Sequence, residues 1–353
     1  MADVYTQLAQ HLDSLPAGFP ATESGVEIQI LKKLFTHQEA GIASKLTMMP
    51  QTSESLASKV GMHSDELAEI LEQMAQKGLI FRYRKKDTVY YMSAQFVVGI
   101  WEYHVNDLDE ELVHLFNEYV PVLMRSAWER TRTKQMRIIP VSEEVEPDAV
   151  VMPYDQADQI IASQSKIAVA PCICRKERGM LGEACQAPVE TCLIFGAGAD
   201  FYLENGLGRE IDQQEALQIV DQGKEAGLVL QPSNAQKPVA MCMCCGCCCQ
   251  ILRNVKGMAK PSQMVHSNFQ ARVDPEACTG CGVCEGLCPM EAITVQNAAE
   301  IDVDRCIGCG VCVNGCEFEA LHLGPKQTDA VYEPPKNVVE TYMNMARERM
   351  EDA

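Results

Sequence analysis

The chain has 353 residues, enough for about two or three domains at roughly 150 residues each. Its 49 acidic residues against 30 basic ones give a formal net charge of -19, which argues against nucleic acid and anionic membranes as the main partners. No stretch approaches the ~18 uninterrupted apolar residues of a membrane-spanning helix, and no secretory signal opens the chain, so we expect a cytoplasmic protein.

Residues 1–100 predict a small helical domain that ends in a hairpin. Apolar residues recur at helical spacing in three runs between residues 26 and 78, and each of the last two runs follows a capping residue. Residues 79–84 and 88–93 then alternate around a short turn, as two strands would. This order resembles the winged helix-turn-helix of bacterial repressors. The expected caps are Thr52 or Ser53 for the second helix and Ser64 for the third, which Gly78 ends.

The charges of this segment argue against DNA binding, because the helix that would enter the major groove carries four acids and one lysine. Only the hairpin is basic. We therefore expect the domain to dock on protein or to dimerise, and we expect His63 to be a solvated or capping residue. The acids are Asp65, Glu66, Glu69 and Glu72, and the basic residues of the hairpin are Arg82, Arg84, Lys85 and Lys86.

Residues 101–155 predict a helical and acidic linker. An amphipathic helix is expected over 107–119. The locally basic stretch 125–137 is interpreted as a solvated linker helix, with the alternative that it receives an acidic surface of a second chain in a homo-oligomer. Residues 140–153, rich in acids and bounded by prolines, are expected to form an acidic linker.

Residues 156–268 predict a cysteine-rich α+β domain. Residues 166–171 are typical of a buried strand, a helix is expected from Asp212 to Ala226, and residues 228–230 are typical of another strand. The glycines within 195–200 lack the spacing of a nucleotide-binding motif and are interpreted as a turn. This domain holds ten cysteines, which we predict to be metal ligands: Cys172, Cys174, Cys185, Cys192, Cys242, Cys244, Cys245, Cys247, Cys248 and Cys249.

The grouping of these ten thiols stays open between a cubane, a zinc site and a division between two clusters. Side chains alternate along an extended backbone, so the consecutive Cys244 and Cys245 are expected to reach different irons or different clusters. We predict one or two further iron-sulfur clusters here. The Cys244-Cys245-Gly246 triplet also resembles a motif of heterodisulfide reductase catalytic subunits, which implies chemistry on a disulfide.

Residues 269–325 contain one motif twice. A shift of 28 residues superposes four cysteines on four others, each set spaced C-x2-C-x2-C-x3-C, with Pro289 after the first set and Glu317 after the second. Zinc motifs bring two pairs of cysteines rather than two runs of four. The pattern resembles bacterial dicluster ferredoxins, which implies two 4Fe-4S clusters, each held by three cysteines of one repeat and the fourth of the other. One cluster would use Cys278, Cys281, Cys284 and Cys316, and the other Cys306, Cys309, Cys312 and Cys288.

The surroundings of the repeat are acidic, with nine acids against one base, Arg305, between residues 273 and 324. Such a surface is expected to dock on a redox protein with a basic surface. Residues 326–353 form a tail, in which Pro334 and Pro335 precede a helix of roughly fifteen residues.

The sequence therefore predicts a multidomain α+β protein that relays single electrons between a dicluster ferredoxin module and a cysteine-rich middle domain. Two alternatives remain: a reductase acting at Cys242–Cys249, and a redox-sensing regulator that binds DNA through residues 1–100. Whether the chain is an iron-sulfur oxidoreductase or an electron-transfer subunit of one is left open. The whole is similar to 4Fe-4S proteins of anaerobes that carry many cysteines, which implies a place in anaerobic metabolism.

Overall fold

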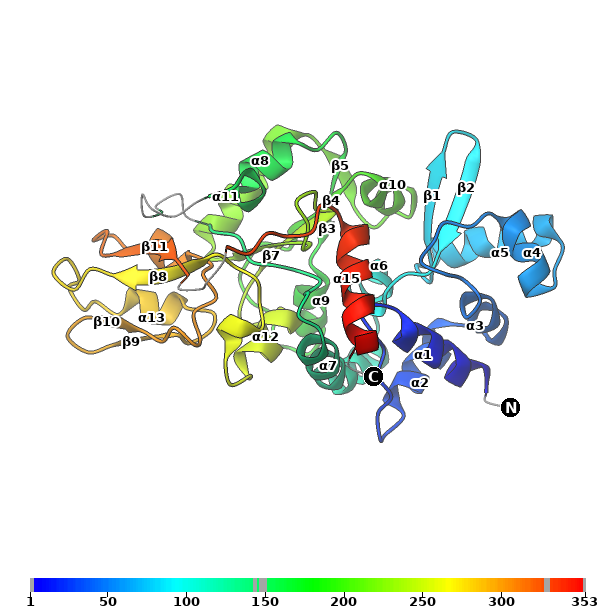
Figure 1. The fold of residues 1–353 in the computed structure, drawn as a ribbon, viewed down its shortest axis with the longest axis horizontal. Helices are drawn as coiled ribbons and strands as arrows, with labels where there is room; N and C mark the ends of the chain where they lie inside the picture. The colour runs from blue at the N-terminus through cyan, green and yellow to red at the C-terminus, as the bar shows by residue number, and fades with distance from the viewer. Residues whose placement is uncertain (1–2, 142–144, 146–150, 327–330, 352–353) are drawn as a thin grey trace. The chain divides into compact units, whose positions relative to one another are not determined.

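The computed structural model describes residues 3–141, 145, 151–326 and 331–351 (Figure 1). Most of the expected acidic linker, residues 142–144 and 146–150, lies outside this part of the chain. The chain folds into two compact units, both of which combine helices with strands. The division into five domains stays a prediction. The first unit comprises Met1–Arg132, Ala197–Arg209 and Tyr342–Ala353, and the second comprises Thr133–Gly196 and Glu210–Thr341.

Short helices and a hairpin begin the first unit. Two helices, α1 and α3, are additional to the expected three. The seven residues of α3 are too few to show a period, and it begins at a capping box between Thr36 and Glu39. Ser64 is not a cap as expected, because the ring of His63 accepts the hydrogen bond from the Asp65 N–H. The elements are α1 (Val4–Ser14), α2 (Val26–Leu34), α3 (His37–Ala43), α4 (Ser53–Val60), α5 (Ser64–Gln76), β1 (Phe81–Lys85) and β2 (Thr88–Met92).

The linker prediction was wrong in its helix boundaries. Instead of two segments, one helix, α7 (Glu110–Arg130), runs from its cap at Asp109 through Pro121. The chain beyond Arg130 is not helical, and Arg137 is 2% exposed rather than solvated, because it pairs with Asp155. The structure thus uses part of the basic stretch for packing. The short helix α6 (Trp101–Tyr103) precedes α7. Before it, η1 (Phe96–Ile100) is an irregular turn, because residues 97–99 do not have helical dihedral angles.

An aromatic core holds the first unit together. The rings of Trp101 and Phe116 stack with centroids 3.6 Å apart, and Phe19 contacts Phe96 and Tyr119. All five side chains are at most 1% exposed, and burial of such large apolar surfaces stabilises the fold.

The glycine-containing segment 195–200 is not the simple turn that the sequence predicted. Gly196 has φ +57°, which lets the chain leave its strand abruptly and begin α10 (Ala197–Glu204). In the first unit the Phe201 ring of this helix packs on Phe81 and Tyr103, with centroids 5.1 and 4.6 Å away. A stretch between two cysteine groups therefore contributes to the core beside the hairpin.

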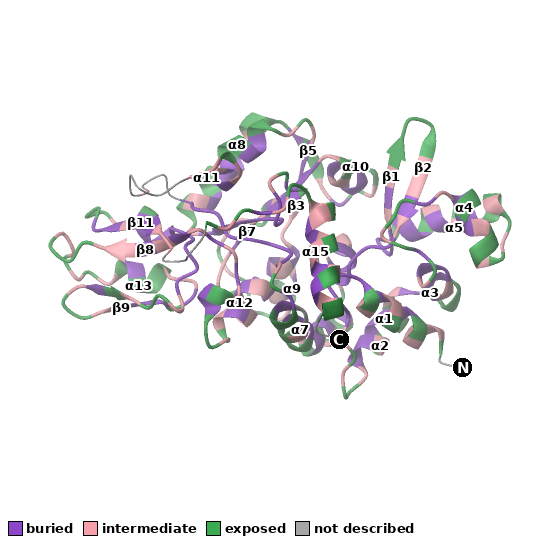
Figure 2. Ribbon diagram, viewed as in Figure 1, coloured by how far each residue is buried: buried purple, intermediate pink, exposed green. Residues whose placement is uncertain are grey.

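A five-stranded sheet dominates the second unit, with strand order β5-β3-β4-β7-β6. Its strands β3, β4, β7 and β6 pair antiparallel. The first four residues of β3 are all buried, as its apolar run predicts, and Figure 2 shows β3 and β7 as mostly buried. The strands are β3 (Ile167–Pro171), β4 (Glu190–Phe195), β5 (Arg209–Ile211), β6 (Val229–Pro232) and β7 (Ala240–Cys244). The helices around them are η2 (Pro153–Asp155), α8 (Ala157–Ala162), α9 (Ile173–Met180), α11 (Gln213–Glu225) and α12 (Gln250–Lys256).

The two sequence repeats adopt matching structures in the second unit. Gly282 and Gly310, 28 residues apart, have φ +81° and +76° and begin the short helices α13 and α14. Strand β8 pairs with β11, and β9 with β10. The elements are η3 (Pro261–Gln263), β8 (Phe269–Val273), α13 (Val283–Leu287), β9 (Ile293–Val295), β10 (Ala299–Ile301), α14 (Val311–Asn314) and β11 (Leu321–Pro325), followed by the expected terminal helix α15 (Val338–Glu351).

Candidate metal centres

Two cavities in residues 269–325 are each lined by four cysteines. The larger, of 280 Å³, brings three cysteines of the first repeat together with one of the second. We call its cysteines the outer set because Cys281 is exposed. They are Cys278, Cys281, Cys284 and Cys316.

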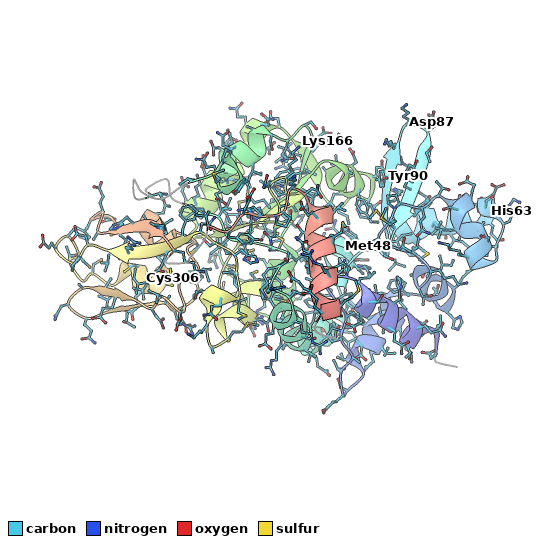
Figure 3. All side chains as sticks on the ribbon, in the orientation of Figure 1. Met48, His63, Asp87, Tyr90, Lys166 and Cys306 are labelled. Carbon is cyan, nitrogen blue, oxygen red and sulfur yellow. The ribbon has the colours of Figure 1, made fainter. Side chains whose placement is uncertain are left out.

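The second cavity, of 20 Å³, reverses this arrangement with three cysteines of the second repeat and one of the first. We call them the inner set, because three of them are buried; one, Cys306, is labelled in Figure 3. The structure thus brings together the same two sets of four that the resemblance to dicluster ferredoxins implies. The inner set is Cys288, Cys306, Cys309 and Cys312.

Close backbone approaches shape both cavities. A Cβ atom at Gly280 would lie 2.6 Å from the Asn297 carbonyl oxygen, and one at Gly308 would lie 2.0 Å from that of Phe269. Glycine is required at these positions by neighbouring carbonyl groups as well as by the positive φ of both residues.

Backbone N–H groups point at the sulfur atoms. Ala271 donates to Cys306 Sγ over 3.4 Å, Ala292 to Cys288 Sγ over 3.2 Å, and Ala299 to Cys278 Sγ over 3.4 Å. Donors of this kind stabilise negative charge on a thiolate and raise the reduction potential of a bound cluster.

The chemistry of the inner set fits a metal group. Burial raises the pKa of the Cys309 thiol to about 12 and also raises the pKa of Cys306. Buried thiols of this kind stay protonated by themselves, whereas a coordinating metal deprotonates them outright. The N–H donors around the sulfur atoms then offset the charge that results.

The ten remaining cysteines separate into two groups. In the first, which we call the four-thiol group, all sulfur atoms lie within 4.8 Å of one another. Cys185 Sγ lies 3.9 Å from Cys245 Sγ, and Cys247 Sγ lies 3.7 Å from Cys248 Sγ. Cys185 comes from the loop between α9 and β4, and the other three from the turn after β7. The four-thiol group is Cys185, Cys245, Cys247 and Cys248.

The other six thiols form a connected network, which we call the six-thiol group. The register of β4 and β7 places Cys192 opposite Cys242, with sulfur atoms 3.9 Å apart. Hydrogen bonds from Cys174 and Cys244 hold the pKa of Cys249 well below its usual range. Further thiol contacts link Cys174 to Cys172, and Cys244 to Cys242. The six-thiol group is Cys172, Cys174, Cys192, Cys242, Cys244 and Cys249.

The consecutive Cys244 and Cys245 belong to different groups, as alternation along an extended backbone predicts. Cys247 and Cys248 both belong to the four-thiol group, because they lie in a turn where this alternation does not hold.

A buried arginine, Arg175, interacts electrostatically with cysteines of both groups. Arg175 donates to the Thr191 hydroxyl and to the Met243 carbonyl oxygen, which fixes its guanidinium inside the second unit. Burial alone would lower the pKa of Arg175, but the thiolates of both groups raise it overall. Sequence reasoning missed this residue, although its place directly after Cys174 in the run Cys-Ile-Cys-Arg is a signal that could have identified it.

Gly246 was also missed as a functional residue. It lies between Cys245 and Cys247, and a Cβ atom here would lie 3.0 Å from the backbone of Pro289. Pro289 directly follows Cys288 of the inner set. The backbone of the cysteine-rich turn therefore lies against the dicluster region at residues that directly follow a cysteine in each segment.

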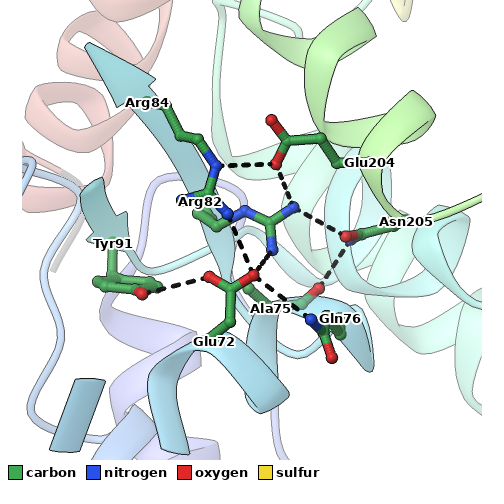
Figure 4. A network of polar contacts seen from close by, with 8 residues as sticks. All are labelled: Glu72, Ala75, Gln76, Arg82, Arg84, Tyr91, Glu204 and Asn205. Carbon is green, nitrogen blue, oxygen red and sulfur yellow. Dashed lines mark hydrogen bonds and ion pairs between the residues drawn. The ribbon is translucent and has the colours of Figure 1, made fainter. Parts of the chain in front are cut away.

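Two arginines of the basic hairpin in the first unit form ion pairs with carboxylates (Figure 4). Arg82, 2% exposed, contacts Glu72 over 2.5 Å and Glu204 over 2.6 Å. The more exposed Arg84 contacts the same two carboxylates over 3.2 and 3.3 Å. Two of the four basic residues considered for DNA are thus neutralised within the protein.

Comparison with known families supports the C-terminal assignment. Residues 270–317 match the family of 4Fe-4S dicluster domains. The chain matches no curated protein and no solved structure significantly. In the described part of the chain, no helix is both long and apolar enough to span a membrane. The match, together with the two four-cysteine cavities, shows that residues 270–317 are a 4Fe-4S dicluster domain with two clusters.

Proposed function

We propose that this protein transfers single electrons between an external redox carrier and an iron-sulfur cluster held by the six-thiol group. The eight cysteines of the outer and inner sets would ligate the dicluster iron. When bound, each cluster supplies one reversible electron acceptor. In each cycle a reduced one-electron carrier with a basic surface loses one electron and the protein gains it.

The surroundings of the outer set suit entry of electrons from a protein partner. Cys281 is exposed, and Val283 and Phe318 beside it are 51% and 49% exposed. Glu285 and Glu317 are exposed around them. An apolar centre with an acidic rim favours a carrier whose own surface is basic.

Contacts with the cysteine-rich region fix the dicluster domain in place. Arg305, the one base between residues 273 and 324, donates to the carbonyl oxygens of Met290 and Lys256 over 2.9 and 3.0 Å. Lys256 also pairs with Glu291 over 2.7 Å. These bonds hold the inner set against the middle region, as a relay requires.

The contact of Gly246 with Pro289 is the observation that carries this proposal. Gly246 follows Cys245 and Pro289 follows Cys288, so the contact brings the turn of the four-thiol group next to the inner set. Cys244, one residue earlier, belongs to the six-thiol group. Because electron transfer slows steeply with distance, a direct backbone contact is an effective route between the two regions.

Anaerobic stopped-flow mixing with a reduced viologen, a cationic one-electron donor, tests the relay, with low-temperature EPR of rapidly frozen samples as the readout. We expect the dicluster signals first and then a further iron-sulfur signal. The variant Cys192→Ser should lose the further signal and keep the dicluster signals. The relay is excluded if the further iron stays oxidised while the dicluster is fully reduced, or if no further iron is present.

A further inference from the structure

We propose that the four-thiol group holds a single tetrahedral metal ion rather than an iron-sulfur cubane. The first argument is the spacing of its sulfur atoms. Four thiolates around one zinc ion at about 2.3 Å lie about 3.8 Å from one another. Two pairs of sulfur atoms in the group are 3.9 and 3.7 Å apart, and all lie within 4.8 Å. The group therefore has the size of the shell around one ion.

The dicluster domain of the same chain provides an internal comparison. In a cubane each thiolate binds a different iron, so the sulfur atoms stand apart with room between them. The cavities of the outer and inner sets differ widely, 280 Å³ against 20 Å³, so the comparison rests on the spacing of the sulfur atoms. Among the described residues, neither dicluster set shows the 4.8 Å clustering of the four-thiol group. The sulfur atoms of the four-thiol group are thus closer together than those of either dicluster set, and their spacing matches one ion better than a cube.

The position of the group suits a structural ion. Four thiolates complete a tetrahedral shell and leave no open position for a substrate, which is typical of structural zinc. The ion would join Cys185 to Cys245, 60 residues later in the chain. It would thereby fasten the loop 181–189 to the turn that touches Pro289.

The local charge also fits. Four thiolates around a divalent ion carry a net negative charge, which needs a counter-charge when partly buried. The guanidinium of Arg175 lies within electrostatic reach of Cys185 and Cys245. Its hydrogen bonds to Thr191 and Met243 keep it there without occupying a coordination position.

Metal analysis and X-ray absorption of the anaerobically purified protein test this inference. We expect one zinc per chain, and a zinc-edge spectrum with four sulfur neighbours at about 2.3 Å and no neighbouring metal. The variant Cys185→Ser should lose the zinc and keep all iron. Ala184→Ser, at the exposed neighbouring position, should lose neither, and Cys192→Ser should lose iron but keep zinc.

The single ion can also be iron instead of zinc, and Mössbauer spectra distinguish one mononuclear iron from a cluster. One mononuclear high-spin iron that disappears in Cys185→Ser supports the inference. Loss of about four irons in Cys185→Ser indicates a cubane and overturns it, as does a metal content that this variant leaves unchanged. Failure of the electron relay would leave the zinc content untouched, so the two proposals can fail separately.

Discussion

Gly246 lies against Pro289 so closely that a Cβ atom would stand 3.0 Å from the proline Cα, Cβ and carbonyl oxygen. The contact joins the turn of the four-thiol group to the residue after Cys288. Because the nearest atoms include backbone, the neighbour cannot move aside as a flexible side chain would. The space at this point is therefore fixed by both segments.

Gly246→Ala should separate these segments and slow electron transfer out of the dicluster domain several-fold. Overpacking should also cost about 1–3 kcal/mol in the free energy of unfolding. Stopped-flow reduction followed by EPR measures the rate. Gly286→Ala is the matched control, because a Cβ there meets nothing within 4 Å. Equal rates in the two variants would show that the contact is not the route.

Serine variants of the outer and inner sets should show that each dicluster signal depends on cysteines from both repeats. Cys281→Ser and Cys316→Ser should perturb the same cluster, although their cysteines belong to different repeats. Cys288→Ser and Cys309→Ser should perturb the other. EPR and iron content measure the outcome. If Cys316→Ser instead matches Cys309→Ser, each repeat holds its own cluster.

Arg82→Ala should lower the free energy of unfolding by about 3 kcal/mol, because it leaves Glu72 and Glu204 without the buried cation between them. Arg84→Ala removes contacts to the same carboxylates, but its side chain is 43% exposed, so the expected loss is ~1 kcal/mol or less. Denaturant unfolding measures the free energy of unfolding of both variants. Similar losses would mean that burial of Arg82 does not determine its contribution.

The protein should not shift DNA fragments at ~150 mM salt, in either the oxidised or the reduced state. Exposed Asp65, Glu66 and Glu69 on α5 would face the phosphates, and Arg82 is already paired. Gel shifts over a range of salt concentrations measure this. Binding that weakens steeply with salt and changes with redox state would favour the regulator instead.

The dicluster region could be predicted in detail because the cysteine and glycine spacing that defines it lies within short, continuous segments. Spacing within each 28-residue repeat fixes which residues form the loops, and the glycines at 282 and 310 begin both short helices as a pair. The winged-helix interpretation of the first unit stays a prediction. Its α3 was missed because a seven-residue helix carries too little periodicity.

The grouping of the middle cysteines could not be predicted, because it depends on the sheet. Cys192 meets Cys242 through the register of β4 and β7, and nothing in the sequence around either residue states that register. Cys185 reaches Cys245 through a loop without regular structure. Likewise, no local signal reveals that Arg82 pairs with Glu204, 122 residues away.

Cys244 ends β7 in the six-thiol group, and Cys245 begins the turn in the four-thiol group. Deletion of a single residue from β7 would bring Cys245 into the place of Cys244 and leave both groups with the wrong number of sulfur atoms. Apart from Gly246, whose space Pro289 restricts, this stretch can therefore accept replacement of a side chain between the cysteines more easily than any change in its length. Its evolution is expected to conserve the distance between thiols even where the surrounding residues vary.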